Sequence, residues 1–187
     1  CLHIMLLVLW LCICDVQFVV FRAWGETTNP GPMLKIESIN VSAMSTAWPL
    51  VKTRDADIIF VQEHLLRKDQ FLDIRANLNR DSETTWRTSW TNLDPEKSRA
   101  AAGVGCVYRH DLKVEQSPAV TDGFKMAVDS GRAARYMVGM HGGEVLDVTV
   151  AYAWTDGHTL ANAAARTNVL FQAIFDELDT AGETAQI

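Results

Sequence analysis

Asp57-Ile-Ile-Phe-Val-Gln-Glu63 decides the fold, because this short run of β-branched and aromatic residues predicts a strand covered on both faces. Just upstream, Leu34-Lys-Ile-Glu-Ser-Ile-Asn40 alternates apolar and polar residues, which is typical of a strand. Just downstream, residues 67–79 space their apolar side chains as a helix does. This mixture of strands and helices predicts the α/β or α+β class, with one mixed sheet and flanking helices.

The rest of the chain continues the same mixture. Its most regular segment is residues 158–178, an alanine-rich stretch with one broad apolar face that predicts a long helix. The other expected elements are a short helix or irregular connection at 45–54, strands at 84–91, 103–108, 135–140 and 145–152, a polar loop at 92–99 and a turn at 141–144.

The composition is that of an ordinary globular protein. The 187 residues are 48% hydrophobic, with 17 Lys and Arg against 23 Asp and Glu and a net charge of −6. Wholesale disorder and low-complexity structure are therefore excluded. The net acidity argues against a general nucleic-acid coat protein, although residues 97–135 carry seven basic and four acidic groups. It does not argue against an enzyme that holds a metal ion with carboxylates.

The chain is expected to divide into three parts. Residues 1–24 form an apolar leader or membrane-like segment, residues 25–32 a Pro/Gly linker, and residues 33–187 the folded domain. Within the first part, residues 2–21 are long and apolar enough to suggest a membrane span or signal-like segment. Two other interpretations stay open: translated flanking sequence of an incomplete reading frame, and buried core.

The four cysteines, Cys1, Cys12, Cys14 and Cys106, form no C-x-x-C pair and have no histidine at metal-ligand spacing. A zinc site and a disulfide framework are therefore not expected. The cysteines are interpreted as reduced, buried thiols.

Two polar residues stand where the first two predicted strands end. Asn40 closes the first strand and Glu63 closes the second. Ligands of α/β sheets gather outside the carboxyl ends of the strands, and a carboxylate with an amide oxygen suits Mg²⁺. A strand-end carboxylate is also a common surface or capping group, so this pattern alone leaves both interpretations open.

The order of these segments resembles the endonuclease/exonuclease/phosphatase superfamily, which includes exonuclease III, deoxyribonuclease I and the endonuclease domains of non-LTR retrotransposons. The similar segments are Leu34-Lys-Ile-Glu-Ser-Ile-Asn-Val-Ser-Ala-Met44, Asp55-Ala-Asp-Ile-Ile-Phe-Val-Gln-Glu-His64, Ala102-Gly-Val-Gly-Cys-Val-Tyr-Arg109 and Val148-Thr-Val-Ala-Tyr-Ala-Trp-Thr155. The resemblance covers about residues 33–180 and implies the first portion of a four-layer α/β/β/α sandwich.

The resemblance also implies roles for three residues. Glu63 would be the metal-binding carboxylate, and Asn40 would orient a phosphate or a metal-bound water. Tyr152 would place its hydroxyl against the scissile phosphate. The implied cofactor is Mg²⁺, with Mn²⁺ as an alternative, and the implied partner is DNA.

Several positions depart from the family pattern. Ile39 replaces a tryptophan, and Trp154 and Thr155 replace a Pro-Asn pair. The G-D-x-N and S-D-H motifs of the family's second half do not occur in this sequence. Residues 33–187 are therefore interpreted as a partial domain that is inactive alone. The histidines at 64, 110, 141 and 158 are interpreted as surface or capping residues, not as substitutes for those motifs.

Three functions are carried forward as hypotheses. The first is a metal-dependent phosphodiester hydrolase, namely a DNA endonuclease of retroelement type, with an intracellular or nuclear location. The second is a lipid or nucleotide phosphatase or phosphodiesterase of the same fold, with residues 2–21 bringing it to a membrane. The third is a non-catalytic remnant or binding module. Substrate specificity and oligomeric state are not predicted.

Overall fold

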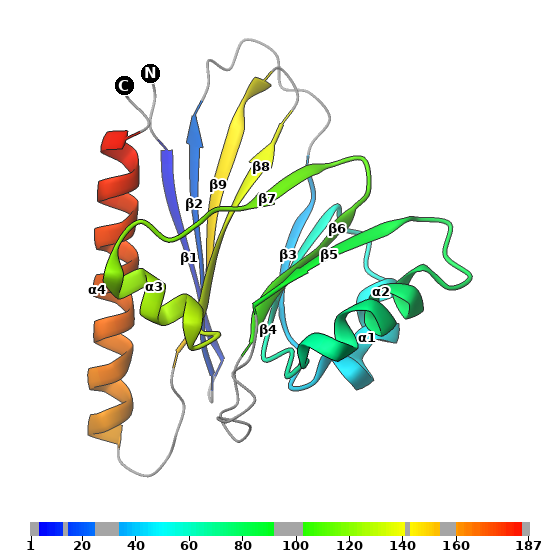
Figure 1. Ribbon diagram of the computed structural model, residues 1–187, viewed down its shortest axis with the longest axis horizontal. Coiled ribbons are helices and arrows are strands. Elements are labelled where there is room, and N and C mark those ends of the chain that lie inside the picture. The colour runs from blue at the N-terminus through cyan, green and yellow to red at the C-terminus, as the bar shows by residue number, and fades with distance from the viewer. Residues whose placement is uncertain are drawn as a thin grey trace.

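The computed structural model describes residues 4–12, 15–24, 34–91, 103–140, 143–153 and 160–184, and these form a mixed α+β fold with two sheets (Figure 1). The described strands are β1 (Ile4–Cys12), β2 (Asp15–Trp24), β3 (Ile36–Asn40), β4 (Ile58–Gln62), β5 (Trp86–Trp90), β6 (Val104–Arg109), β7 (Lys113–Gln116), β8 (Ala133–Gly139) and β9 (Val145–Tyr152). The helices are α1 (Met44–Lys52), α2 (Phe71–Asn79), α3 (Asp122–Asp129) and α4 (Leu160–Thr184), with a 3₁₀ turn, η1 (Lys68–Gln70), before α2.

The smaller sheet contains the two strands that the sequence marked as decisive. Its strand order is β3-β4-β6-β5, with β3 parallel to β4 and the other pairs antiparallel. The register places Asn40 opposite Gln62 at the carboxyl ends of β3 and β4. The sequence predicts one mixed sheet, whereas the described residues form two sheets, of which this one is mixed. Its parallel pair brings two polar strand ends to one edge.

The larger sheet is antiparallel throughout, in the order β1-β2-β9-β8-β7. Its first two strands come from the apolar N-terminal segment, for which the sequence left three interpretations open. In the structure β1 and β2 pair with one another, and β2 pairs with β9 along Gln17–Trp24. Among the described residues, no helix has the length and apolar character needed to cross a membrane.

The two sheets face each other across an apolar core. Alternate residues of β9 point into it, because successive side chains of a strand lie on opposite faces. Val148, Val150 and Tyr152 belong to this central cluster together with Phe60 and Tyr136. The rings of Phe60 and Tyr136 lie 5.9 Å apart between centroids, so aromatic packing joins the sheets near their middle.

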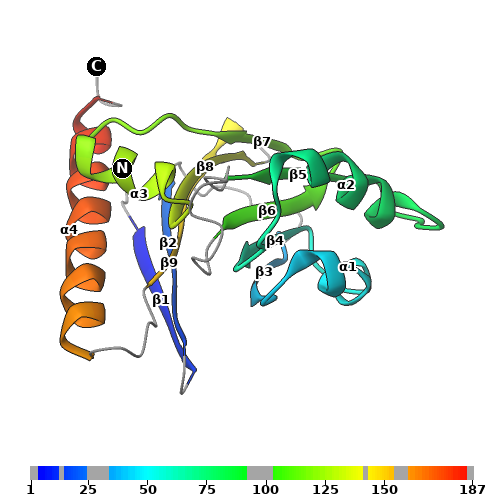
Figure 2. The ribbon, with the colours of Figure 1, turned by 60° about the horizontal axis from the view of Figure 1, so that its bottom comes forward.

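Helices cover the outer face of each sheet. The first outer cluster includes Met44 and Val51 of α1 and Ile74 and Leu78 of α2. The second includes Phe124 of α3 and four residues of α4 and β9, namely Leu170, Ile174, Leu178 and Ala151. Figure 2 shows the α1–α2 pair and the α3–α4 pair on opposite sides of the molecule.

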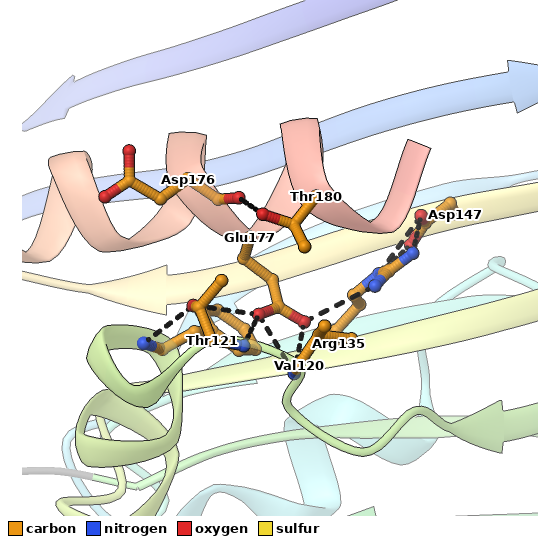
Figure 3. A network of polar contacts seen from close by, with 8 residues as sticks. Val120, Thr121, Arg135, Asp147, Asp176, Glu177 and Thr180 are labelled. Carbon is orange, nitrogen blue, oxygen red and sulfur yellow. Dashed lines mark hydrogen bonds and ion pairs between the residues drawn. The ribbon is translucent and has the colours of Figure 1, made fainter. Parts of the chain in front are cut away.

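A buried network of charges ties α4 to the larger sheet (Figure 3). The guanidinium of Arg135 on β8 donates to the Asp147 carboxylate on β9 at 2.6 and 2.9 Å and to Glu177 of α4 at 3.5 Å. Glu177 also accepts from the backbone N–H groups of Val120 and Thr121. Because both carboxylate side chains are fully buried, the network fixes α4 against the start of α3.

Most of the elements expected between residues 34 and 178 are confirmed, with ends that differ by a few residues. The structure adds β7 and α3, which the sequence analysis did not predict. Helix α3 begins at a cap in which the Thr121 hydroxyl accepts from the Phe124 N–H. The linker at 25–32, the loop at 92–99 and residues 141, 142, 154 and 155 lie outside the described residues.

Candidate functional site

The site begins where β3 and β4 end side by side. The pairing of these strands continues one residue past β3, because the Val41 N–H donates to the Gln62 carbonyl at 3.1 Å. Glu63 follows directly and adopts the left-handed backbone conformation, with φ of 56°. The chain therefore leaves the sheet by a sharp turn at Glu63, the residue that the strand pattern singled out.

Glu63 meets Tyr152 across the two sheets. The Tyr152 hydroxyl donates to Glu63 Oε1 at 2.5 Å, and the two residues are 89 positions apart in the chain. Tyr152 ends β9 and is fully buried, whereas Glu63 is half-buried. Two of the three residues that the sequence nominated thus form one polar contact at a common end of the facing sheets.

Asn40 lies on the strand next to Glu63 but does not join this contact. Its Oδ1 accepts from the Ser42 N–H at 3.0 Å, which shapes the turn after β3. Its Nδ2 is buried and has no partner in the part of the chain that the structure describes, and Gln62 Oε1 is in the same condition. A buried donor without a partner costs free energy, so Asn40 holds a hydrogen-bond donor that a ligand oxygen would satisfy.

Arg132 contributes a buried cation that sequence reasoning missed. It is 3% exposed and its Nη1 donates to the Ala153 carbonyl at 3.0 Å. Its guanidinium carbon lies 4.9 Å from the centroid of the Tyr152 ring, and the Tyr152 N–H donates to the Arg132 carbonyl. In the sequence, Arg132 stands between Gly131 and the apolar strand β8. A charged residue next to a buried strand is uncommon, and this position was the signal that could have drawn attention to it.

His64 corrects the interpretation of the histidines as surface or capping residues. Its side chain is fully buried, and burial lowers the pKa of the imidazole to about 4. His110, in contrast, is exposed, in agreement with the expectation. His141 and His158 lie outside the described residues.

The donor set fits a magnesium ion better than a zinc ion. Mg²⁺ is usually held by one or two carboxylates and keeps several waters, so the Glu63 carboxylate would suit such an ion, whereas the Asn40 amide oxygen already accepts from the Ser42 N–H. A structural zinc site needs about four nitrogen or sulfur ligands, and no group of three or more His, Cys, Asp or Glu residues converges among the described residues. Cys106, whose side chain the structure describes, is buried and free, as expected.

The comparisons with known proteins do not extend this picture. No protein-family model matches the chain, and neither the curated proteins nor the solved structures contain a significant match. Function therefore has to be inferred from the geometry of the site itself.

Proposed function

We propose that this chain provides part of the active site of a metal-dependent phosphodiester hydrolase, namely a DNA endonuclease of retroelement type. The observation that carries the proposal is the contact between Glu63 and Tyr152, with Asn40 on the adjacent strand end. A carboxylate can hold a divalent cation, and a phenol and an amide donor beside it can contact a phosphate oxygen.

The fold assignment behind this proposal is a four-layer α/β/β/α sandwich. It is supported by one core between the two sheets and by one helix-covered cluster outside each sheet. The parallel order of β3 and β4, with the Asn and the Glu at their carboxyl ends, is the arrangement that the family resemblance implies.

Each residue has a distinct role in the proposed site. Glu63 would hold Mg²⁺ or Mn²⁺, and Asn40 Nδ2 would donate to a phosphate oxygen. The Tyr152 hydroxyl would orient the Glu63 carboxylate and lie beside the same phosphate. The bound ion would stabilise the negative charge that develops on the phosphoryl oxygens.

DNA is proposed as the substrate on two grounds. The sequence resemblance includes retrotransposon endonucleases, and the central part of the chain is basic although the whole is acidic. Arg132 adds a positive charge directly behind Tyr152, which favours a polyanionic ligand at this end of the sheets.

The first experiment measures cation binding by the 187-residue chain. Isothermal titration with Mn²⁺ should give one site, and Glu63→Gln should abolish it because the amide cannot supply the carboxylate charge. Glu37→Gln is the matched control, since Glu37 lies on β3 and pairs only with Arg54, at 3.7 Å among the described residues. Equal binding by the wild type and Glu63→Gln would reject the metal role of Glu63.

The second experiment measures catalysis with the longest product that the reading frame encodes. We expect Mg²⁺-dependent nicking of supercoiled plasmid, with a loss of at least about 100-fold in Glu63→Gln. A parallel panel of phosphoinositides, sphingomyelin and nucleotides separates the substrates: hydrolysis of lipid without DNA would overturn the endonuclease proposal. Failure of every substrate, together with failure to bind Mn²⁺, would favour a binding module.

A further inference from the structure

The turn that carries Glu63 has an unusual backbone. Glu63 and Leu65 both adopt positive φ values, 56° and 50°, and the residue between them is His64. Residues other than glycine rarely adopt this conformation, and each instance costs on the order of 1 kcal/mol or more. Two such residues in three positions persist only if the surrounding structure holds them in place.

Backbone hydrogen bonds fix both sides of Glu63. The His64 N–H donates to the Gly103 carbonyl at 3.1 Å, and the His64 carbonyl accepts from the Met44 N–H at 2.9 Å. On the other side, the Gln62 carbonyl accepts from the Val41 N–H. These bonds hold the residues before and after Glu63. They do not fix the backbone after His64, at Leu65, which needs another constraint.

The imidazole of His64 supplies that constraint. Its Nδ1 accepts from the Leu66 N–H at 2.9 Å, so the ring ties its own backbone to the amide two residues further on. With Nδ1 as the acceptor, the proton of the neutral ring lies on Nε2, which is 3.5 Å from the Thr91 hydroxyl oxygen. The ring therefore closes a small loop around Leu65 and keeps it in its left-handed conformation.

Tight packing prevents the ring from turning away. The imidazole lies 5.1 Å from the Trp90 ring and 6.3 Å from the Phe71 ring between centroids. A Cβ atom added to Gly103 would lie 2.7 Å from two atoms of the imidazole, so only glycine leaves space for it there. The orientation of His64 is therefore set by three neighbouring elements, β5, α2 and the start of β6.

We propose that His64 is a positioning residue, whose buried imidazole holds the Glu63 turn and so aims the Glu63 carboxylate at Tyr152. His64 does not touch the proposed metal or phosphate; it acts through the backbone of its neighbour. The inference rests on the proposed function only where Mn²⁺ affinity is measured. The conformation of Glu63 can be tested in a crystal structure without any ligand.

A histidine that merely filled the core would behave differently. In that case an aromatic ring of similar size would replace it without effect on Glu63. If the Nδ1 acceptor is what matters, asparagine should substitute, because its Oδ1 occupies about the position of Nδ1 and accepts the same hydrogen bond. The pair His64→Phe and His64→Asn thus separates volume from hydrogen bonding.

The experiment combines crystal structures with Mn²⁺ titration of the full chain. In His64→Phe we expect Glu63 to leave the left-handed region and to lose its hydrogen bond to Tyr152. We also expect a dissociation constant for Mn²⁺ raised by about 10- to 100-fold, the usual effect of losing an outer-shell partner. His64→Asn should stay within about threefold of the wild type.

Each outcome decides the proposal. Retention of the left-handed Glu63 and its bond to Tyr152 in His64→Phe would overturn it, whatever the metal affinity. If the wild type binds no Mn²⁺, the proposed function fails while the crystal structures still test His64. If His64→Phe does not fold, Gly103→Ala replaces it, because the added Cβ displaces the His64 ring. If the ring is displaced in that crystal structure and Glu63 has not moved, the proposal is wrong.

Discussion

Two buried polar clusters of this molecule differ in how completely their groups are paired. In the Arg135 network, the guanidinium meets two carboxylates, and the Glu177 oxygens also accept backbone N–H groups (Figure 3). Around Glu63, in contrast, Asn40 Nδ2 and Gln62 Oε1 are buried and have no partner among the residues that the structure describes, and the backbone of Glu63 is left-handed. Complete pairing is what structural stability requires, whereas unpaired groups and strain are typical of sites that bind something.

The largest effect is expected from breaking the Arg135 network. Arg135→Ala leaves the buried carboxylates of Asp147 and Glu177 without their cation, which should lower the free energy of unfolding by about 3–5 kcal/mol. Urea denaturation measures this loss. Arg67→Ala is the control, because the Arg67–Asp69 pair is largely exposed and should matter little. A loss below about 1 kcal/mol in Arg135→Ala would contradict the structural role.

The next effect concerns pH and His64. The folded state holds the pKa of His64 near 4, below its usual value of 6.5, so folding favours the neutral ring. This contribution to stability is fully present above pH 6.5 and is lost as pH falls from 6.5 to 4. Its full size is about 3 kcal/mol, since the pKa falls from 6.5 to about 4 and each pKa unit corresponds to about 1.4 kcal/mol.

Urea denaturation of the wild type and of His64→Asn across this pH range measures the His64 contribution. The carboxylates affect both proteins alike, so the difference between the two curves isolates the histidine. We expect the advantage of the wild type to shrink steadily below pH 6.5. A constant difference would show that His64 does not titrate in this window.

A smaller effect is expected from the contact between the sheets. Tyr152→Phe removes the hydroxyl that donates to Glu63 and should lower the free energy of unfolding by about 1–2 kcal/mol. Tyr136→Phe is a matched control from the same core, because its hydroxyl contacts the Ser89 carbonyl at 3.5 Å and the Cys106 thiol, which are both neutral groups. If both variants lose the same amount in thermal or urea unfolding, the Glu63 contact adds nothing specific.

The smallest effect is expected at Gln62. Gln62→Met removes an amide whose oxygen has no partner among the described residues, so no satisfied acceptor is lost. The remaining Gln62 bond, to the Ser38 hydroxyl, is partly exposed. Stability should therefore change by less than about 1 kcal/mol, in either direction, in urea denaturation. A loss as large as that of Arg135→Ala would remove the distinction between the two clusters.

The elements that could be predicted from the sequence are those whose pattern of apolar and polar residues shows which faces are buried. Strand β4 is apolar up to its last residue, Gln62, because both of its faces are buried, and α4 shows one broad apolar face. The N-terminal segment was ambiguous for a physical reason: continuous apolar residues suit a buried strand and a membrane helix equally, and no periodicity distinguishes them. Only the pairing of β2 with β9, more than 120 residues away, places it in the sheet.

The candidate site was predictable only in part. Asn40 and Glu63 stand at strand ends that the sequence marks, whereas Tyr152 was nominated by resemblance alone. The environments of His64 and Arg132 are formed by distant residues, among them Gly103 for the first and Tyr152 for the second. A single sequence does not reveal such neighbours, because neither residue belongs to a local motif that requires burial.

The bond between Tyr152 and Glu63 also has a consequence for the order of folding. It joins two residues that are 89 positions apart and links the turn after β4, in the smaller sheet, to the end of β9, in the larger sheet. Closing a long loop costs entropy that is recovered only when both ends are already ordered. The site should therefore assemble after the local hairpins and helices, so that a nascent or partly folded chain holds those elements but not the paired carboxylate and phenol.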